Sequence, residues 1–387
     1  MDVSFTAEQE AFRLGLRAWI ARELPADWAG PRFTGPADED ENARFQTWWE
    51  RRLYDAGYQG IHWPTAYGGQ GLGIVEQLIA AEEFGRASAP EGINTIGKEL
   101  VGPIVLAVGS EEQKRELIPR LLRLDDIWCQ GFSEPDAGSD LAGLRTRAVL
   151  EGDHWVVNGQ KLWTSFARFA NKCILLARTD PDAPKHKGLT LFVLDMQTPG
   201  ITVRPVRQMT DRREFNEVFL DNVRIPAGMH LGGINEGWHA AVGVLGFERA
   251  TARLYRQARF QAEFSELLRL LAARPEKARD GWFRQTVGTL AAELRMLRLL
   301  NLKTASRIAT GRGIGSEASI VKLFWSELHQ RITTFALEVL GEDFAAGAPG
   351  VERFRYLYLQ ARAETLYAGT SEIQRSIIAE RMLGLPR

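Results

Sequence analysis

The sequence predicts an α+β protein of three consecutive parts, and the spacing of its apolar residues is the main reason. Apolar side chains recur at helical spacing in the first third of the chain and again in the last third. Between these regions the period changes to two, with turn residues separating β-branched or aromatic runs. The order helical, β, helical excludes a doubly wound parallel sheet. We expect an N-terminal helical domain at 1–124, a middle β domain at 125–236 and a C-terminal helical bundle at 237–387.

The helical domains are predicted from apolar residues three and four positions apart, which share one face of a helix. In the first domain these residues are Phe12, Leu16, Trp19 and Ile20, and later Leu117, Leu121 and Leu124. In the last domain they are Leu290, Leu294, Leu297 and Leu300. Glycine- and proline-containing segments, such as 29–36 and 68–71, separate the helices of the first domain.

The strands of the middle domain are predicted from short β-branched and aromatic runs. His154–Val157 leads into Asn158-Gly159, a pair typical of a tight hairpin turn, and Gln160–Trp163 forms the expected return strand. The further expected strands are Cys173–Ala177, Leu189–Leu194, Ile201–Val206 and Glu217–Leu220.

Composition excludes several classes of function. Lysine and arginine number 48 against 49 aspartates and glutamates. The chain as a whole therefore lacks the excess positive charge that would draw it to nucleic acid or to an anionic membrane surface. Its uncharged stretches are too short to span a bilayer, and its N-terminus does not resemble a secretory signal. The 2 cysteines suggest no disulfide framework, which favours a cytoplasmic location. The 6 histidines show no metal-ligand spacing, so we expect no metal site.

Three glycine-rich segments imitate nucleotide-binding motifs. Gly92–Lys98 has the spacing of a P-loop, but Glu99 stands where a hydroxyl should bind magnesium, and no strand is expected before it. Segments 69–71 and 311–313 begin a dinucleotide fingerprint that neither completes. We interpret all three as turns or loops.

Four segments carry the strongest functional signal when they are taken together. They are Ser133–Asp140, Lys161–Ser165, Phe215–Pro226 and Tyr367–Arg375. The first alone would be an ordinary turn of Pro, Asp, Gly and Ser. In this order and at these separations, the four resemble the acyl-CoA dehydrogenase family over essentially the whole chain. The resemblance implies an N-terminal helical domain, a middle β-barrel-like domain and a C-terminal four-helix bundle, assembled into tetramers.

The resemblance also implies FAD, whose flavin ring needs polar groups along one edge and apolar cover on its faces. Gln130, Phe132 and Ser133 match residues along the pyrimidine side of the ring. Trp163 and Ser165 match residues that cover one face and hydrogen-bond near N5. Outside the motif, an aromatic such as Trp163 would more simply be a core residue.

Three further positions match cofactor or substrate contacts of the family. Thr370 and Glu372 match FAD contacts, the glutamate acting from a neighbouring subunit, and Ser139 matches a contact to the CoA portion of the substrate. Arg249 begins a series of arginines that could meet CoA phosphates or a partner, although most such charges are simply solvated.

The chemistry needs a base for the α proton of the thioester, and the usual position has lost it. Much of the family has a glutamate directly before Gly369, where this chain has Ala368. A minority places the glutamate at the start of the first long C-terminal helix, and Glu248 occupies that position. Either Glu248 is the base or it merely pairs with a nearby arginine; Glu364 and Glu372 are weaker alternatives.

The resemblance implies an electron-transferring flavoprotein as acceptor and trans-2-enoyl-CoA as product. The small Ala368 and Gly369 could admit a bulky, branched or steroid side-chain substrate. Family segments that hold FAD from a neighbour are altered near 256–264 and 338–342, so the assembly is either a homotetramer or an α2β2 heterotetramer with a paralogous subunit. Two other functions stay open: a non-catalytic or FAD-sharing subunit, and a flavin oxidase or monooxygenase.

Overall fold

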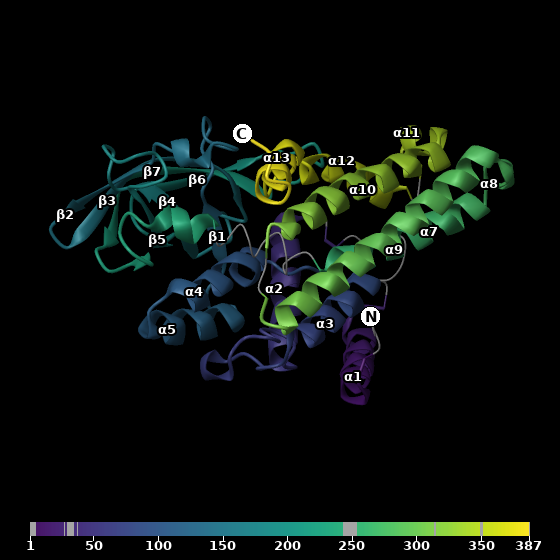
Figure 1. Cartoon of the computed structure of the whole chain (residues 1–387), viewed down its shortest axis with the longest axis horizontal. Coiled ribbons are helices and arrows are strands. Elements are labelled where there is room, and N and C mark those ends of the chain that lie inside the picture. The colour runs from purple at the N-terminus through teal and green to yellow at the C-terminus, as the bar shows by residue number, and fades with distance from the viewer. Residues whose placement is uncertain are drawn as a thin grey trace. The chain divides into compact units, whose positions relative to one another are not determined.

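The structure is a computed structural model that describes residues 5–26, 28, 35–36, 38–242, 254–312, 315–348 and 351–386. The chain forms two compact units, which are described separately. Unit 1 consists of Met1–Ala37, Leu72–Pro90 and Arg249–Arg387, and unit 2 consists of Asp38–Gly71 and Glu91–Glu248. Helices precede and follow a section of β-strands along the chain, which confirms the predicted fold class (Figure 1).

Unit 2 contains the sheet and the helices that cover it. Its helical elements are α2 (Glu39–Asp55), η1 (Thr65–Tyr67), η2 (Gly97–Val101), α4 (Gly102–Val108), α5 (Glu111–Leu122) and η3 (Leu141–Gly143). Two of these helices begin at side-chain caps. Asp38 accepts a hydrogen bond from the N–H of Glu41, and Ser110 forms a reciprocal capping box with Gln113.

The eight strands form one mixed sheet. They are β1 (Trp128–Gly131), β2 (Arg147–Glu151), β3 (His154–Ser165), β4 (Lys172–Arg178), β5 (Leu189–Asp195), β6 (Ile201–Val206), β7 (Phe215–Pro226) and β8 (His230–Leu231). The strand order is β6-β7-β3-β2-β4-β5-β8, and β1 pairs with β4 in parallel. The four further strands expected from the sequence lie within β4, β5, β6 and β7, so those predictions are confirmed.

The hairpin predicted at Asn158-Gly159 is wrong, because β3 continues through both residues. The turn lies earlier, at Gly152-Asp153, between the paired residues Glu151 and His154. Asn158 instead accepts a 2.8 Å hydrogen bond from the N–H of Asn222 across the sheet. Gly159 is needed for close approach, since a Cβ there would lie 2.4 Å from Thr146 Oγ1. A residue pair that is typical of a turn therefore lies at a shift in the register between β3 and β7, within a long strand.

Both faces of the sheet bury apolar side chains, as the alternation along β4 shows. Ile174 and Leu176 belong to the core that includes residues of α4 and α5, whereas Leu175 and Ala177 belong to a second core with Val218. The helices α4 and α5 therefore cover one face of the sheet. The same packing confirms the apolar repeat of α5, where Leu117 and Leu121 are buried.

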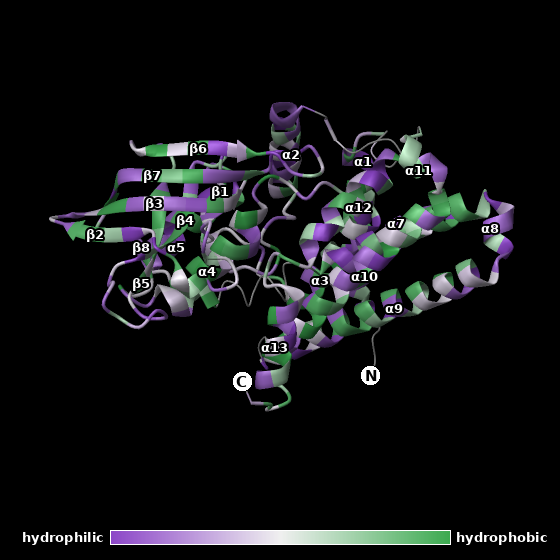
Figure 2. Ribbon diagram, turned by 90° about the horizontal axis from the view of Figure 1, so that it is seen from above, coloured by the Kyte–Doolittle hydropathy of each residue, from purple (hydrophilic) through white to green (hydrophobic). Residues whose placement is uncertain are grey.

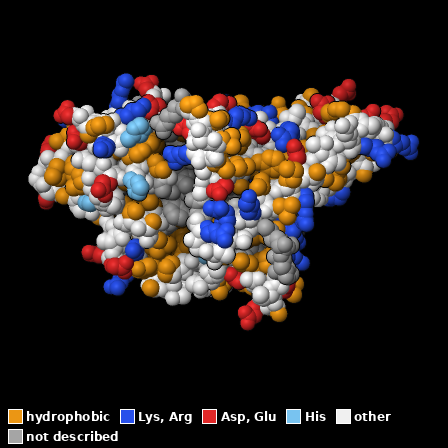
Figure 3. Space-filling view, viewed as in Figure 1, with side chains coloured by type: hydrophobic (Ala, Val, Ile, Leu, Met, Phe, Trp, Pro, Cys, Tyr) orange, Lys and Arg blue, Asp and Glu red, His pale blue; other side chains and the backbone are white. Residues whose placement is uncertain are grey.

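Unit 1 is helical. Its helices are α1 (Ala7–Glu23), α3 (Ile74–Arg86), α7 (Tyr255–Ala272), α8 (Pro275–Arg279), α9 (Gly281–Ala309), α10 (Glu317–Leu340), α11 (Glu342–Ala346), α12 (Glu352–Glu364) and α13 (Ser371–Arg381). Figure 2 shows hydrophilic and hydrophobic residues interleaved along the long helices. The predicted stripe on α9 is confirmed, with Leu290, Leu294 and Leu297 buried. Lysine and arginine side chains are concentrated at the end of the helical unit where α8 connects α7 to α9 (Figure 3).

The segment with P-loop spacing packs as ordinary structure. Helix α3 precedes it instead of a strand, and the N–H of Gly92 donates a 2.9 Å hydrogen bond to Gln46 Oε1. Lys98 forms an ion pair with Glu50, a fully buried carboxylate that also accepts from the N–H of Asn94. These bonds occupy the groups that a phosphate would need. Among the described helices, none combines the length and the apolar character that crossing a membrane requires.

Replacing Gly159 by alanine tests the role of close approach in β3. The new methyl group would collide with both the side chain and the backbone of Thr146, so we expect the Gly159→Ala variant to lose about 1–3 kcal/mol of unfolding free energy. Gly228→Ala is the matched control, because a Cβ there meets nothing within 4 Å. Urea denaturation of both variants checks the prediction, and equal midpoints would contradict it.

Candidate functional site

The two predicted flavin-contacting segments of unit 2 lie side by side. The N–H of Leu162, next to Trp163, donates a 2.9 Å hydrogen bond to the carbonyl of Ser133. One residue earlier, the Lys161 ammonium donates a 3.0 Å hydrogen bond to the carbonyl of Phe132. Segments about thirty residues apart in the sequence are thus held together by one main-chain and one side-chain hydrogen bond, as expected if both contact one ligand.

Three of the predicted cofactor-binding side chains are polar and half-buried. Within the part of the chain that the structure describes, the side chains of Gln130, Ser133 and Ser165 make no hydrogen bond. Partly buried donors and acceptors normally find partners in a folded protein or in water. These three groups are therefore available to the polar edge of a ligand.

Trp163 is not a core aromatic, because 54% of its surface is exposed. It lies in an irregularity of the β3–β7 pairing between Lys161 and Thr164, and its φ of 59° falls in the left-handed region. Irregularities of this kind re-aim a side chain out of the strand pattern. The indole packs edge-on against Phe215, with ring centroids 5.9 Å apart. One large aromatic surface is thereby left accessible beside the polar groups.

A buried ion pair joins the two segments that carry Ser133 and Trp163. Lys161 is fully buried, and its ammonium lies 2.8 Å from Glu134 Oε1. Burial lowers the pKa of Lys161, an effect that the charge of Glu134 opposes. Burial raises the pKa of Glu134, but Lys161 and two backbone N–H groups outweigh this effect and lower it. The contact between Lys161 and Glu134 holds Phe132–Glu134 against β3.

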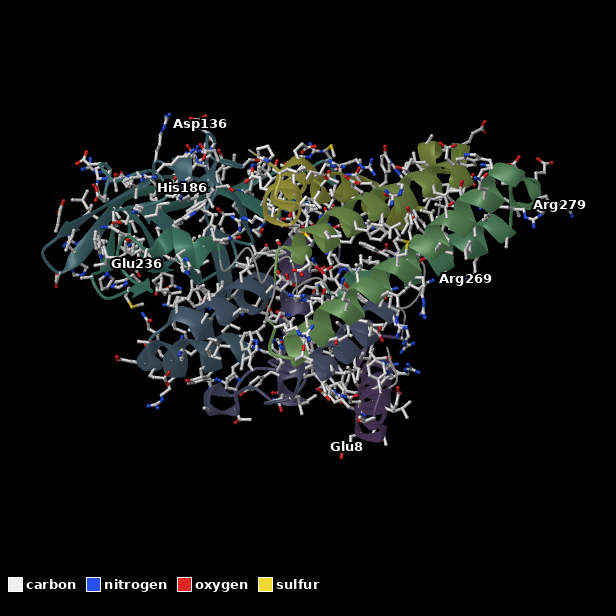
Figure 4. All side chains as sticks on the ribbon, viewed as in Figure 1. Glu8, Asp136, His186, Glu236, Arg269 and Arg279 are labelled. Carbon is white, nitrogen blue, oxygen red and sulfur yellow. The ribbon has the colours of Figure 1, made fainter. Side chains whose placement is uncertain are left out.

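Ser139, the predicted CoA contact, is exposed on the loop that follows the first motif. The loop begins with a tight turn in which Glu134 and Ala137 exchange main-chain hydrogen bonds of 3.0 and 3.1 Å. Asp136 projects into solvent from this turn (Figure 4). The interpretation of the segment as a turn and its proposed functional role are therefore compatible.

The residues in unit 2 fit a planar heteroaromatic group with one polar edge. Accessible aromatic surface comes from Trp163, and unpartnered polar side chains come from Gln130, Ser133 and Ser165. A flavin has this combination of apolar faces and a polar pyrimidine edge. Among the described residues, no three or more His, Cys, Asp or Glu side chains are grouped so that they could hold a metal ion.

Four further predicted site residues, Ala368, Gly369, Thr370 and Glu372, lie in unit 1 at the corner between α12 and α13. Ala368 and Gly369 both adopt positive φ, at 55° and 88°. The fully buried Gln374 donates hydrogen bonds of 2.9 and 3.2 Å to their carbonyls. The N–H of Ala368 makes no hydrogen bond to any residue that the structure describes. This corner therefore presents a fixed backbone donor.

Helix α13 begins directly after the corner, at Thr370. The hydroxyl of Thr370 caps the helix by accepting from the N–H of Ile373. Glu372 is exposed, and its own backbone N–H is the main group that lowers its pKa. A helix N-terminus favours negative charge, so this end of α13 suits the phosphates of a nucleotide. The predicted cofactor roles of Thr370 and Glu372 stay predictions.

The predicted base, Glu248, and its neighbour Arg249 lie outside the described residues. Glu364, a weaker alternative, is buried with both oxygens engaged. Oε1 lies 2.7 Å from Arg256 Nη1 and Oε2 lies 2.6 Å from His329 Nδ1. Because both of its oxygens are already engaged by these side chains, Glu364 is not suited to be the base.

Glu364 belongs to a buried network that sequence reasoning missed. His329 lies between two carboxylates, with Nδ1 facing Glu364 and Nε2 3.1 Å from Glu263 Oε2. Burial lowers the pKa of His329, but the charges and hydrogen bonds of both glutamates outweigh burial and raise it to about 9. The signal in the sequence was weak: Lys322, Trp325 and His329 recur on one face of α10, but polar residues on a helix are usually solvated.

A groove of about 820 Å³ lies beside the corner and is formed by α9, α10, α12 and α13. Its lining includes Leu366 and Trp282, which are 63% and 54% exposed. Charged residues of both signs, including Glu372 and Arg375, also line it. Two large exposed apolar side chains in a concave surface are typical of a contact surface.

Comparison with known proteins gives consistent matches over the whole chain. Three family models match in order: acyl-CoA dehydrogenase N-terminal domain at 6–125, middle domain at 129–223 and C-terminal domain at 235–383. The chain is 39% identical to acyl-CoA dehydrogenase IpdE1 of Mycobacterium tuberculosis, over 98% of both chains.

Two solved structures resemble the fold closely over 100% of both chains. The first is the Tcur3481-Tcur3483 steroid ACAD, with a TM-score of 0.85 and 31% identity. The second is the ChsE4-ChsE5 complex from Mycobacterium tuberculosis, with a TM-score of 0.84 and 29% identity. These similarities support the predicted resemblance, including its steroid branch, and family membership implies a flavin cofactor.

The losses of stability caused by removing Lys161 and by removing the charge of Glu134 should not be additive, because the two groups form one buried ion pair. Lys161→Met leaves a buried, uncompensated carboxylate, so we expect a loss of about 3–5 kcal/mol of unfolding free energy. The double variant Lys161→Met/Glu134→Gln should be less destabilised than the sum of the single changes. Urea denaturation measures both values. Lys185→Met is the control, because its ion pair with Asp140 is exposed; strictly additive losses would refute the coupling.

The His329 network should make the protein less stable at alkaline pH. The pKa of His329 is raised from 6.5 to about 9, so its contribution is complete below 6.5 and is lost as pH rises through about 9. That difference corresponds to about 3 kcal/mol. Thermal melts between pH 7 and 10 should show the fall in the wild type and in the control His239→Gln, but not in His329→Gln. Parallel pH profiles for all three would contradict the role of His329.

Proposed function

Because the chain belongs to the acyl-CoA dehydrogenase family, we propose that it removes two hydrogens across the α and β carbons of an acyl-CoA thioester. FAD is the proposed cofactor and trans-2-enoyl-CoA the product. The observation that carries the proposal lies in unit 2, where the segment with exposed Trp163 is hydrogen-bonded to the segment with Ser133, and where the side chains of Gln130, Ser133 and Ser165 make no hydrogen bond among the described residues.

In this proposal the residues of unit 2 bind and orient the cofactor. Gln130 and Ser133, with Phe132, hold the polar edge of the flavin, while Trp163 covers one face and Ser165 hydrogen-bonds near it. Thr370 contacts FAD, Glu372 contacts FAD from a neighbouring subunit, and Ser139 contacts CoA. When bound, FAD supplies a two-electron acceptor for hydride from the β carbon.

Glu248 is the proposed base that removes the α proton. It follows the apolar run Val242–Phe247, and an apolar setting raises the pKa of a carboxylate toward a useful range. The engagement of both Glu364 oxygens supports this choice by removing an alternative. The N–H of Ala368, which has no acceptor among the described residues, is suited to stabilise charge on the thioester carbonyl. Arg249 is proposed to contact the substrate.

The proposed substrate is bulky, either branched or a steroid side-chain thioester. Ala368 and Gly369 leave space where much of the family has a glutamate side chain. The steroid ACAD that resembles this chain at 31% identity also supports this class. A cytoplasmic location and an electron-transferring flavoprotein as the acceptor complete the proposal.

The proposed assembly is an α2β2 heterotetramer with a paralogous subunit, and a homotetramer is the competing arrangement. The groove with exposed Leu366 and Trp282 offers a surface on which another subunit could pack. The ChsE4-ChsE5 complex supports a heteromeric arrangement by resemblance. A second candidate function, a non-catalytic or FAD-sharing subunit, is favoured by one observation, which is the methyl group of Ala368 at the usual position of the base.

Anaerobic titration with straight-chain, branched and steroid acyl-CoAs, followed by visible absorption, tests these proposals. The protein should be purified both alone and with a co-expressed paralogous subunit. Flavin that is bleached by one thioester class would support the dehydrogenase and identify its substrate. Flavin bound only in the presence of the partner would support the heterotetramer, and a flavin that no thioester bleaches would overturn the proposed reaction.

Glu248→Gln distinguishes the catalytic subunit from the non-catalytic one. We expect the variant to retain flavin and to lower the rate of bleaching by about 10²-fold or more, because a general base contributes on that order. Glu276→Gln, an exposed change on α8, is the matched control and should behave as the wild type. Stopped-flow absorbance measures both rates. An unchanged rate in Glu248→Gln would place the base elsewhere, in this chain or its partner.

A further inference from the structure

Five ionisable side chains meet in the interior of unit 1, far more charge than a helical bundle normally buries. Arg256 and Glu263 come from α7, Lys322 and His329 from α10, and Glu364 from the end of α12. Each is at most 9% exposed. Buried charges are costly unless they are paired and hydrogen-bonded, so a concentration of this kind needs an explanation beyond packing.

Four of these side chains, Glu263, His329, Glu364 and Arg256, form a continuous chain of ionic hydrogen bonds that ends at Tyr367. Glu263 Oε2 lies 3.1 Å from His329 Nε2, and His329 Nδ1 lies 2.6 Å from Glu364 Oε2. Arg256 Nη1 then donates to Glu364 Oε1 at 2.7 Å, while Nη2 donates to the Tyr367 hydroxyl at 3.0 Å. Lys322 Nζ donates to the Glu364 carbonyl at 2.9 Å. The end of α12 is thus held by side chains from α7 and α10.

The geometry requires His329 to be a cation. Each ring nitrogen faces a carboxylate oxygen, and only the doubly protonated ring can donate to both. Phe260 stacks on the imidazole at 4.0 Å and excludes water from one face. The charged groups facing this site are Arg259 and Arg256 on α7, Lys322 on α10 and Arg353 on α12, besides the two glutamates.

The chain of bonds ends where the backbone is strained. Tyr367 directly precedes Ala368, whose φ of 55° costs a residue with a side chain about 1–2 kcal/mol. Gln374 holds the carbonyls of this corner from α13, and the Ala368 N–H is left without an acceptor among the described residues. A donor that must meet a ligand at a fixed place needs support from both sides.

We propose that the buried chain from Glu263 through His329, Glu364 and Arg256 to Tyr367 positions the Ala368–Gly369 corner so that its free N–H can bind the thioester carbonyl. The inference rests on the proposed dehydrogenation and adds four positioning residues to it. None of them touches the reacting atoms. Their role is to hold Tyr367, and through it the strained backbone of Ala368, in one conformation.

Tyr367→Phe tests the inference because it cuts the link to the corner and leaves the ring and all buried charges in place. Tyr358→Phe, a partly buried tyrosine on α12 outside the chain of bonds, is the matched control. Hydrogen exchange of peptides covering 365–374 reports the corner without any turnover. We expect amides such as Ser371 and Gln374 to exchange about tenfold faster in Tyr367→Phe, and to stay as in the wild type in the control.

The kinetic readout uses the flavin-loaded assembly and the thioester that bleaches it. Tyr367→Phe should lower kcat about tenfold with little change in KM, because a misplaced donor weakens the transition state more than substrate binding. His329→Gln should show the same loss at pH 7, and the wild type should approach that variant at pH 10. If the network has only a structural role, these variants should lower the melting temperature without the selective loss of kcat and without its dependence on pH.

The outcomes separate the inference from the proposed function. Unchanged exchange at the corner in Tyr367→Phe overturns the inference, whether or not a thioester bleaches the wild type. Faster exchange with an unchanged kcat also overturns it, because the corner would then be mobile without consequence for the reaction. If no thioester bleaches the wild-type assembly, the dehydrogenation fails, and faster exchange still supports the positioning of the corner.

Discussion

The ion pair between Lys161 and Glu134 is the constraint on which the predicted flavin site of unit 2 depends. The two residues come from different motifs, and their contact brings those motifs together. The Lys161 ammonium also donates to the Phe132 carbonyl, and Glu134 accepts from the N–H groups of Arg145 and Thr146. Because these bonds are all made inside the protein, removing either charged partner leaves the other charge buried and uncompensated. The pair therefore holds in place the two segments that carry the half-buried polar groups.

The corner of unit 1 solves a similar problem with different residues. Trp163 and Ala368 both carry side chains at positive φ, where glycine would be unstrained. A buried ionic network adjoins each of them, Lys161–Glu134 in one unit and Arg256–Glu364–His329 in the other. Strain at functional positions persists only where the surroundings over-determine the conformation. Charged hydrogen bonds provide that support because they fix both distance and direction.

Much of the fold was predictable from the sequence because apolar periodicity reports burial directly. The stripe of Leu290, Leu294 and Leu297 became one buried face of α9, and Ile201–Val206 became β6 with the same bounds. The hairpin at Asn158-Gly159 failed because the same two residues suit a turn and a close approach between strands equally well. Local sequence does not reveal that Thr146 packs against the glycine, since that contact depends on the pairing of β2 and β3.

The sequence indicates candidate site residues only where they lie in contiguous motifs, and the roles of those residues stay predictions. Three predicted flavin contacts lie within the motifs, namely Ser133, Trp163 and Ser165, and Gln130 lies just before the first motif. A resemblance in these motifs can therefore suggest their roles. The positioning network has no such signal, because Glu263, His329 and Glu364 come from three helices and each alone could be a solvated surface charge. Only tertiary packing brings them within hydrogen-bonding distance.

The short side chain of Ala368 affects how the corner is held together. A glutamate at this position could contribute its own hydrogen bonds to the corner, whereas a methyl group contributes none. The corner must then be fixed through its backbone and its neighbours, which here are Gln374 on one side and Tyr367 with Arg256 on the other. The bonds from Gln374 and the contact between Tyr367 and Arg256 therefore supply, around Ala368, the hydrogen bonds that its methyl side chain cannot make.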